Sequence, residues 1–168
     1  MRVAVTGTPG TGKTTATERL DTDLDVIHLN DVIKSEGFST DVDEERGSLV
    51  ADMDALADWL ADREDSIVES HLAHNFEADR VVVLRAHPET IVDRLRERGD
   101  SDSKAYENAE SEALDVVLSE AVHHHGAENV YEIETTDRDP DAVAADIAAV
   151  VAGEREPSAG TVDYVEWL

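Results

Sequence analysis

The chain has 168 residues, a length that fits one ordinary α/β domain and leaves little room for a second independent core. Its 40 acidic and 14 basic side chains give a formal net charge of −26. This charge excludes a generic nucleic-acid-binding module and argues against docking on an anionic membrane, because both depend on basic side chains. The absence of cysteine excludes a disulfide framework and a thiolate zinc site.

The acidic side chains are spread along almost every segment, and the only lysines are Lys13, Lys34 and Lys104. This composition is typical of a halophilic protein. At about 1 M salt the Debye length falls to roughly 3 Å, so repulsion within a dense carboxylate surface is screened. In dilute buffer we expect the same surface to destabilise the fold.

Apolar residues make up 40% of the chain and fall in ordered runs, which predicts that the chain folds despite its charge. No apolar run reaches the roughly 20 residues of a membrane span. The sequence starts directly with a strand-like segment, so we also expect no signal peptide. These features favour a cytoplasmic enzyme.

Strand and helix patterns alternate along the first half of the chain. In chain order they predict a strand over residues 2–6, a glycine-rich turn over 7–12, a helix from 13 to about 20, a strand over 25–29 and a short helix from 30 or 31 to about 37. Residues 38–47 are polar and acidic, and we expect this segment to be mobile. A helix is expected between Leu49 and Asp62, where apolar residues recur at three- and four-residue steps.

The second half continues this alternation. It predicts strands over residues 66–69 and 80–85, a helix from 88 to 99, an exposed loop over 100–104, a helix over 109–124, a strand over 130–133 and a helix over 141–152. Strands that alternate with helices are typical of an α/β fold with a parallel sheet covered on both faces. Residues 153–168 end in an apolar cluster that either folds back onto the domain or docks on a partner protein.

A complete G-x-x-x-x-G-K-[ST] phosphate-loop motif lies between the first predicted strand and helix, as residues 7–14. Its glycines let the backbone approach a polyphosphate, and successive N–H groups at the helix N-terminus form an anion nest. In this motif the lysine reaches the β- and γ-phosphates and the next hydroxyl group ligates magnesium. Lys13 is therefore a candidate catalytic residue, and Thr14 a candidate magnesium ligand.

A second anchor for magnesium is expected from an acid at the end of a neighbouring strand. Glu69 ends the predicted strand over residues 66–69 and would hold the metal directly or through water. His71 follows two residues later, where it would orient a water molecule or relay a proton in the phosphate cleft. The alternative is that His71 is an ordinary polar loop residue.

Positive charge is also needed over the oxygens of a phosphoryl group in transfer. Arg94 and Arg98 are four residues apart, so they project from the same face of a predicted helix. The alternative is that they only interact favourably with the helix dipole. Lys34 and Lys104 are further candidates, although either could pair with a nearby acid.

Together these segments resemble the adenylate kinase isoenzyme 6 family, which is found in archaea and in eukaryotic nuclei. The resemblance depends on the phosphate loop over residues 7–15, on Glu69-Ser70-His71, and on residues 94–99 followed by Glu107 and Asn108. It spans residues 1 to about 150. We therefore divide the chain into a P-loop domain over residues 1–152 and a tail over 153–168.

The resemblance implies a three-layer P-loop fold with a monophosphate-binding arm and a short lid. It implies magnesium-dependent phosphate transfer from ATP to AMP or another monophosphate, together with ATPase activity. It also implies a role in maturing the small ribosomal subunit. In that role the protein would bind the eleventh protein of this subunit and, through it, contact the small-subunit rRNA. We expect the protein to be a monomer that does not bind a membrane.

Carried over residue by residue, the resemblance implies contacts to the ATP phosphates from Gly10, Gly12, Lys13, Thr14 and Thr15. Asp31 and Lys34 would bind the monophosphate, with lysine where many relatives have arginine. Arg98 would open the lid and contact ATP, and Arg94 would lie beside the transferred group.

Two functions follow as hypotheses. The first is an ATP-dependent nucleoside monophosphate kinase with ATPase activity. The alternative is an assembly factor whose ATP hydrolysis times the release of a ribosomal partner. A GTPase switch is disfavoured, because the sequence lacks an Asn-Lys-x-Asp guanine-reading stretch.

Overall fold

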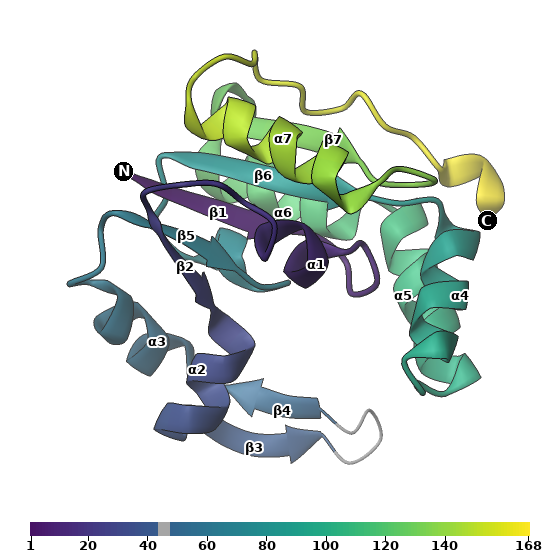
Figure 1. Cartoon of the computed structure of the whole chain (residues 1–168). Coiled ribbons are helices and arrows are strands. Elements are labelled where there is room, and N and C mark those ends of the chain that lie inside the picture. Colours follow the sequence, from purple (N-terminus) through teal and green to yellow (C-terminus); the bar gives the residue numbers. More distant parts are fainter. Residues whose placement is uncertain (44–47) are drawn as a thin grey trace.

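A five-stranded parallel sheet forms the centre of the molecule in the computed structural model, which describes residues 1–43 and 48–168 (Figure 1). The spatial order of its strands is β2-β5-β1-β6-β7. Their bounds are Arg2–Thr6 for β1, Asp25–His28 for β2, Ser66–Glu69 for β5, Arg80–Arg85 for β6 and Val130–Glu134 for β7. These strands agree with the predicted ones to within one residue.

Seven helices are described around the sheet. They are α1 (Lys13–Thr17), α2 (Leu29–Glu36), α3 (Met53–Leu60), α4 (Pro88–Glu97), α5 (Asp102–Ala113), α6 (Val116–His125) and α7 (Pro140–Val151). Three short 3₁₀ turns, η1 (Ala73–Asn75), η2 (Ala127–Asn129) and η3 (Val165–Trp167), complete the helical elements. Among the described residues, no helix is long and apolar enough to cross a membrane.

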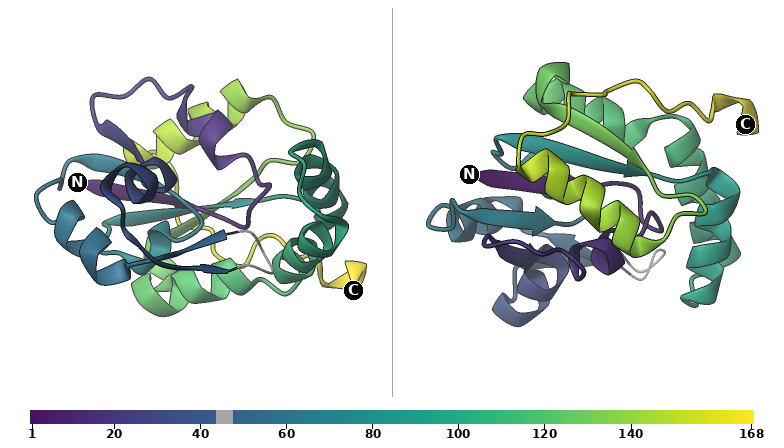
Figure 2. Two further views of the ribbon diagram at one scale, coloured as in Figure 1. Left: turned by 90° about the horizontal axis from the view of Figure 1, so that it is seen from below. Right: turned by 45° about the horizontal axis from the view of Figure 1, so that its top comes forward.

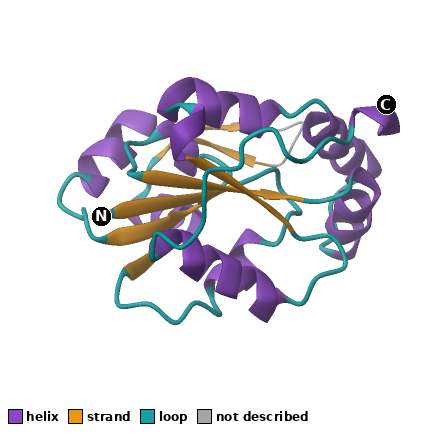
Figure 3. Ribbon diagram, turned by 90° about the horizontal axis from the view of Figure 1, so that it is seen from above, coloured by secondary structure: helices purple, strands orange, loops and turns teal. Residues whose placement is uncertain are grey.

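The alternation of side chains along the strands builds a separate core on each face of the sheet. Val3 and Val5 of β1 pack with residues of α1 and α7, whereas Ala4 packs on the other face with residues of α2, α3 and α6. The resulting three layers are visible from above (Figure 3). The predicted α/β fold with a covered parallel sheet is therefore confirmed.

The helical hairpin, by which we mean α4 and α5, stands at the end of the sheet and has a core of its own (Figure 1). Ser101 caps α5, because its hydroxyl oxygen accepts a hydrogen bond from the Lys104 backbone N–H at 3.2 Å. The exposed loop predicted over residues 100–104 is therefore wrong, since residues 102–104 form the first turn of a helix. A first turn can form without apolar residues when a cap satisfies its N–H groups.

The single helix predicted over residues 109–124 is also wrong, because the chain breaks between α5 and α6. Asp115 has a φ of 57°, in the left-handed region. Its carboxylate accepts a hydrogen bond at 2.6 Å from the buried Arg85, an interaction that stabilises this unfavourable backbone conformation. Leu114 is 53% exposed at this break.

A small antiparallel hairpin of β3 (Ser39–Asp43) and β4 (Ser48–Ala51) replaces part of two expected elements. The predicted mobile segment covers residues 38–47, of which 39–43 form β3 and 44–47 lie outside the described residues. The helix expected from Leu49 begins only at Met53, because Leu49 pairs with Val42 in the sheet and Asp52 caps α3. Apolar spacing alone could not distinguish a strand followed by a helix from one longer helix.

Shorter differences affect the first two helices. The helix expected to end near residue 20 ends at Thr17, and α2 begins at Leu29 directly after β2, so neither Asn30 nor Asp31 caps it. Beyond α7, the tail crosses the molecule to the helical hairpin (Figure 2). Trp167 of the tail packs against the apolar core of that hairpin.

Candidate functional site

The phosphate loop, residues 7–12, connects β1 to α1 at the carboxyl edge of the sheet. Gly7 has a φ of 150°, and a Cβ atom there would lie 2.7 Å from the carbonyl oxygen of Leu84. Gly10 has a φ of 94°, and its added Cβ would lie 3.2 Å from the Leu95 side chain of α4. These two positions require glycine because of backbone conformation and close packing.

Lys13 folds back into this loop. Its ammonium group donates hydrogen bonds to the carbonyl oxygens of Gly7 at 2.9 Å and Thr8 at 3.1 Å. Burial lowers the pKa of Lys13 to about 8, although the negative charges of Glu69 and Glu112 oppose this shift. The loop therefore holds a buried cation that an incoming polyphosphate can bind.

Glu69 ends β5, whose neighbour β1 leads into the phosphate loop. The side chain is buried, and its Oε1 atom accepts a hydrogen bond from the Thr14 hydroxyl at 3.2 Å. Its Oε2 atom lies 2.8 Å from Nδ1 of His28, at the end of β2. Three neighbouring segments of the carboxyl edge thus converge on one carboxylate.

The side-chain oxygen atoms at this position suit a magnesium ion. Thr14 and Glu69 offer hard oxygen ligands of the kind Mg²⁺ prefers, and they lie within hydrogen-bond distance of each other. In the described part of the chain, no group of three or more His, Cys, Asp or Glu side chains could hold a metal. A magnesium ion here would complete its coordination with water and phosphate oxygens, as this ion commonly does.

His71 lies near Lys13, on the segment that follows β5. Burial and, to a smaller extent, the positive charge of Lys13 lower the pKa of His71 to about 4. At neutral pH the imidazole is therefore uncharged. It can hold a water molecule by a hydrogen bond, but it is a weak proton acceptor.

The two candidate arginines, Arg94 and Arg98, do not meet at one point. Arg94 donates hydrogen bonds to the carbonyl oxygen of Gly10 at 3.1 Å and to the hydroxyl of Thr135 at 3.3 Å. Arg98 is largely exposed and pairs with Asp100 at 2.5 Å. Its positive charge still reaches the site, because it contributes to the lowered pKa values of Lys13 and His71.

Lys104 lies on the first turn of α5, and its charge likewise contributes to the lowered pKa of His71. Asp31 and Lys34 lie apart from these groups, on exposed positions of α2. Among the described residues, no hydrogen bond or ion pair joins Asp31 or Lys34 to the phosphate loop. The structure thus brings Lys13, Thr14 and Glu69 together at the loop. Arg98 pairs with Asp100 instead, and the predicted monophosphate residues lie on a separate arm.

A cavity of about 170 Å³ lies between α1 and α7, next to the loop. Its lining includes Gly12, Thr15 and Arg94, which the sequence singled out, and Thr135 and Val143, which it did not. Thr135 follows the carboxyl end of β7, and that position is the one sequence feature that could have indicated it.

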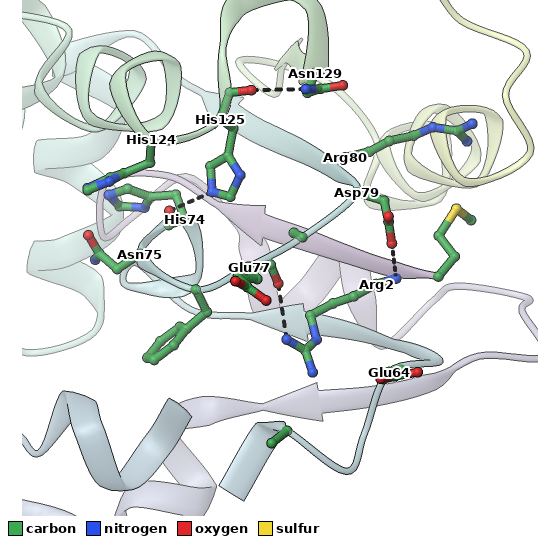
Figure 4. A pocket seen from close by; sticks show the side chains of 14 residues that line it. Arg2, Glu64, His74, Asn75, Glu77, Asp79, Arg80, His124, His125 and Asn129 are labelled. Carbon is green, nitrogen blue, oxygen red and sulfur yellow. Dashed lines mark hydrogen bonds between the residues drawn. The ribbon is translucent and has the colours of Figure 1, made fainter. Parts of the chain in front are cut away.

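A larger hollow of about 1330 Å³ opens at the opposite edge of the sheet (Figure 4). Arg2, which lines this hollow, donates hydrogen bonds to the carbonyl oxygens of Glu77 and Leu60. Ligands of open parallel sheets bind at the carboxyl ends of the strands, so this hollow is not the phosphate site.

Sequence reasoning also missed His28 and Glu112. His28 contacts Glu69, and Glu112 accepts a hydrogen bond from the Thr8 hydroxyl at 3.1 Å. A strand-end position was the only signal for His28. Nothing in the sequence distinguished Glu112 from the many other acids of its helix.

The chain was compared with known families and structures. A family profile described as an AAA domain matches residues 3–115. Proteins described as "Putative adenylate kinase" are 65% identical in Halobacterium salinarum and 62% identical in Natronomonas pharaonis, over the full length of both chains. A Pyrococcus furiosus protein of the same description is 37% identical over 99% of this chain and 92% of its own.

Solved structures show the same fold at low identity. Shikimate kinase from Acinetobacter baumannii, in complex with shikimate, matches with a TM-score of 0.63 at 15% identity, over 92% of this chain and 94% of its own. The relatives in halophilic archaea match this chain over its full length, at 65% and 62% identity. These matches confirm the family that the motifs indicated and the halophilic character that the composition indicated. The chain therefore belongs to the family of archaeal P-loop kinases described as "Putative adenylate kinase", and it is a phosphotransferase.

Proposed function

We propose that this protein transfers the γ-phosphoryl group of ATP to a nucleoside monophosphate, with AMP as the first candidate acceptor. The observation that carries the proposal is the phosphate loop, where the buried Lys13 ammonium lies close to the Thr14 and Glu69 oxygens. The relatives described as adenylate kinases support an adenylate acceptor.

In the proposed complex, the polyphosphate lies over residues 7–14 and the base of ATP lies in the cavity between α1 and α7. Lys13 exchanges the Gly7 and Thr8 carbonyl oxygens for phosphate oxygens. Arg94 lines the cavity, so its contacts favour a place beside the donor nucleotide.

Cations of the helical hairpin would stabilise the negative charge that develops on the phosphoryl oxygens during transfer. Arg98 and Lys104 both act electrostatically on His71, so their charge reaches the cleft. Thr14 and Glu69 would hold a magnesium ion, which neutralises phosphate charge and aligns phosphate oxygens when bound. Asp31 and Lys34, which both lie on α2, would bind the monophosphate. This helix belongs to the arm that also carries β3 and β4.

The neutral His71 supports the further proposal of ATP hydrolysis when no acceptor is bound. An uncharged imidazole can orient a water molecule without adding a positive charge beside Lys13. Hydrolysis and transfer would then use the same donor site and differ in the acceptor.

A coupled assay in concentrated KCl with magnesium tests the proposal. AMP, CMP, GMP and UMP are compared as acceptors, with an acceptor-free reaction that measures bare hydrolysis. Formation of a diphosphate from at least one acceptor, faster than hydrolysis, is expected. If ATP is bound but no monophosphate yields a diphosphate, the kinase proposal is wrong.

The alternative, an ATPase that binds the eleventh small-subunit ribosomal protein, partly relied on a free apolar tail. Trp167 instead packs on the helical hairpin and donates a hydrogen bond to Glu89 at 2.6 Å. Trp167 is thus engaged within the chain, whereas Val165 and Leu168 of the tail remain 52% and 57% exposed. Nucleotide-dependent recovery of small-subunit protein from a salt-adapted lysate would support it, and empty pull-downs in every nucleotide state would contradict it.

A further inference from the structure

Glu112 of α5 forms a buried contact with the phosphate loop. Its side chain is 2% exposed. Oε1 accepts hydrogen bonds from the Thr8 hydroxyl and from Nε of Arg85, both at 3.1 Å, and Oε2 accepts one from the Ala86 backbone N–H at 2.8 Å. The carboxylate thus joins three segments that are distant in the sequence.

Arg85, which is fully buried, anchors this carboxylate. Its guanidinium also donates to Asp115 at 2.6 Å and to Glu132 of β7 at 2.5 Å. One buried cation therefore holds three carboxylates in place. Such a network is costly to break, because a lost partner leaves a charge buried without compensation.

Thr8 connects this network to Lys13. Its hydroxyl donates to Glu112, while its carbonyl oxygen accepts hydrogen bonds from the Lys13 ammonium at 3.1 Å and from the Thr11 hydroxyl at 2.8 Å. Thr8, one of the two residues whose carbonyl oxygens hold Lys13, is thus tied to the helical hairpin.

We infer that Glu112 is a positioning residue that couples the phosphate loop to the helical hairpin through the hydroxyl of Thr8. When a polyphosphate draws Lys13 away from the Thr8 carbonyl, the rearranged loop acts on α5 through this contact. The hairpin also carries Arg98 and Lys104, so nucleotide binding and the placement of these cations become linked. The inference rests on the proposed binding of ATP over the loop.

Three threonine variants separate this coupling from a merely structural role. Thr8→Val removes the hydroxyl at nearly constant volume and leaves the Arg85–Glu112 contact in place, whereas Thr8→Ser keeps a hydroxyl. Thr17→Val is the matched control: Thr17 is equally buried, but its hydroxyl bonds only within α1, to the carbonyl oxygens of Lys13 and Thr14.

Two measurements are made in concentrated KCl. Calorimetry gives the ATP dissociation constant, and hydrogen exchange gives the change in α5 amide protection at saturating ATP. We expect Thr8→Val to weaken ATP binding about fivefold or more, as for a modest coupling between sites, and to lose the ATP-induced protection of α5. Thr8→Ser and Thr17→Val are expected to retain both properties.

Glu112→Gln provides a second test that does not need Thr8→Val, and it is expected to reduce the α5 response as well. Where Thr8→Val folds, adding it to Glu112→Gln should weaken ATP binding less than about twofold more. The inference is wrong if α5 protection in the unmodified protein does not respond to ATP, or if both variants respond as the unmodified protein does. Neither measurement needs phosphate transfer, so a failed acceptor assay would overturn only the proposed function.

Discussion

The ammonium group of Lys13 lies inside the phosphate loop, where two carbonyl oxygens of the loop hold it. A charge buried in this way has little water to give up when a phosphate replaces those carbonyls, so its interaction with the ligand is strong. In the proposed function, Lys13 therefore contributes to both binding and transfer of the phosphoryl group.

We expect Lys13→Ala to reduce phosphate transfer by a factor of about 10² or more, as for the loss of one preorganised charge at a transition state. The coupled assay measures this loss. Lys34→Ala is the comparison, because Lys34 of α2 is the lysine proposed to bind the monophosphate. It should raise the KM for the monophosphate and change the KM for ATP less than about twofold. Retained turnover in Lys13→Ala would contradict the assignment.

His74 is a buried polar residue with a different role. The distances, 2.7 Å from Nδ1 to the Thr6 hydroxyl and 2.7 Å from Nε2 to Glu120, suit a neutral ring that accepts from Thr6 and donates to Glu120. Burial lowers the pKa of His74 below its ordinary 6.5. Glu120 opposes this shift, and the neighbouring His124 and His125 add to it.

Stability should therefore fall in mild acid. Below pH 6.5 His74 takes up a proton in the unfolded chain but not in the folded one. The free energy of unfolding therefore decreases as the pH decreases, by up to about 1.4 kcal/mol per pH unit for one proton. Denaturant unfolding between about pH 5 and pH 7.5 measures this slope. His74→Gln should reduce it, with a remainder from His71, and His123→Gln on the exposed end of α6 should follow the unmodified protein. An unchanged slope in His74→Gln would contradict the prediction.

At the scale of elements, the tail holds the helical hairpin. The ring of Trp167 stacks on Tyr106 of α5 with centroids 6.5 Å apart, and its Nε1 donates to Glu89 of α4. Farther back along the tail, Thr161 donates hydrogen bonds from its N–H and hydroxyl groups to Glu132 of β7. The tail thus contacts both the central sheet and the hairpin.

We expect Trp167→Ala to lower the free energy of unfolding by about 1–2 kcal/mol, the range for losing a partly buried aromatic contact and a hydrogen bond. Denaturant unfolding measures the change. Leu168→Ala is the matched control, because Leu168 is 57% exposed and should contribute less than about 0.5 kcal/mol. Equal stability of the two variants would show that the tail does not support the hairpin.

At the scale of the whole molecule, the net charge of −26 opposes the compact state. Salt screens exposed charges, so the midpoint of thermal unfolding should rise between about 0.2 M and about 3 M KCl, by about 2–4 °C for each kcal/mol of repulsion removed. Sucrose at equal osmolality serves as the control for excluded-solute effects. A midpoint that is independent of KCl would contradict this prediction.

The sequence by itself determined the five strands of the parallel sheet and the phosphate loop. It also indicated that Thr14 and Glu69 belong to one site. A complete motif between a strand and a helix needs only neighbouring residues, and the carboxyl ends of adjacent parallel strands necessarily meet. Apolar runs and glycines encode both features locally.

Only the tertiary structure decided where the chain breaks between α5 and α6, which acid holds Thr8, and where the tail lies. Asp115 adopts a left-handed conformation that Arg85, 30 residues away, stabilises. Thr8 and Glu112 are 104 residues apart, and Glu112 is one acid among 40. The partner of a buried carboxylate depends on how distant segments pack, and no pattern among neighbouring residues contains that information.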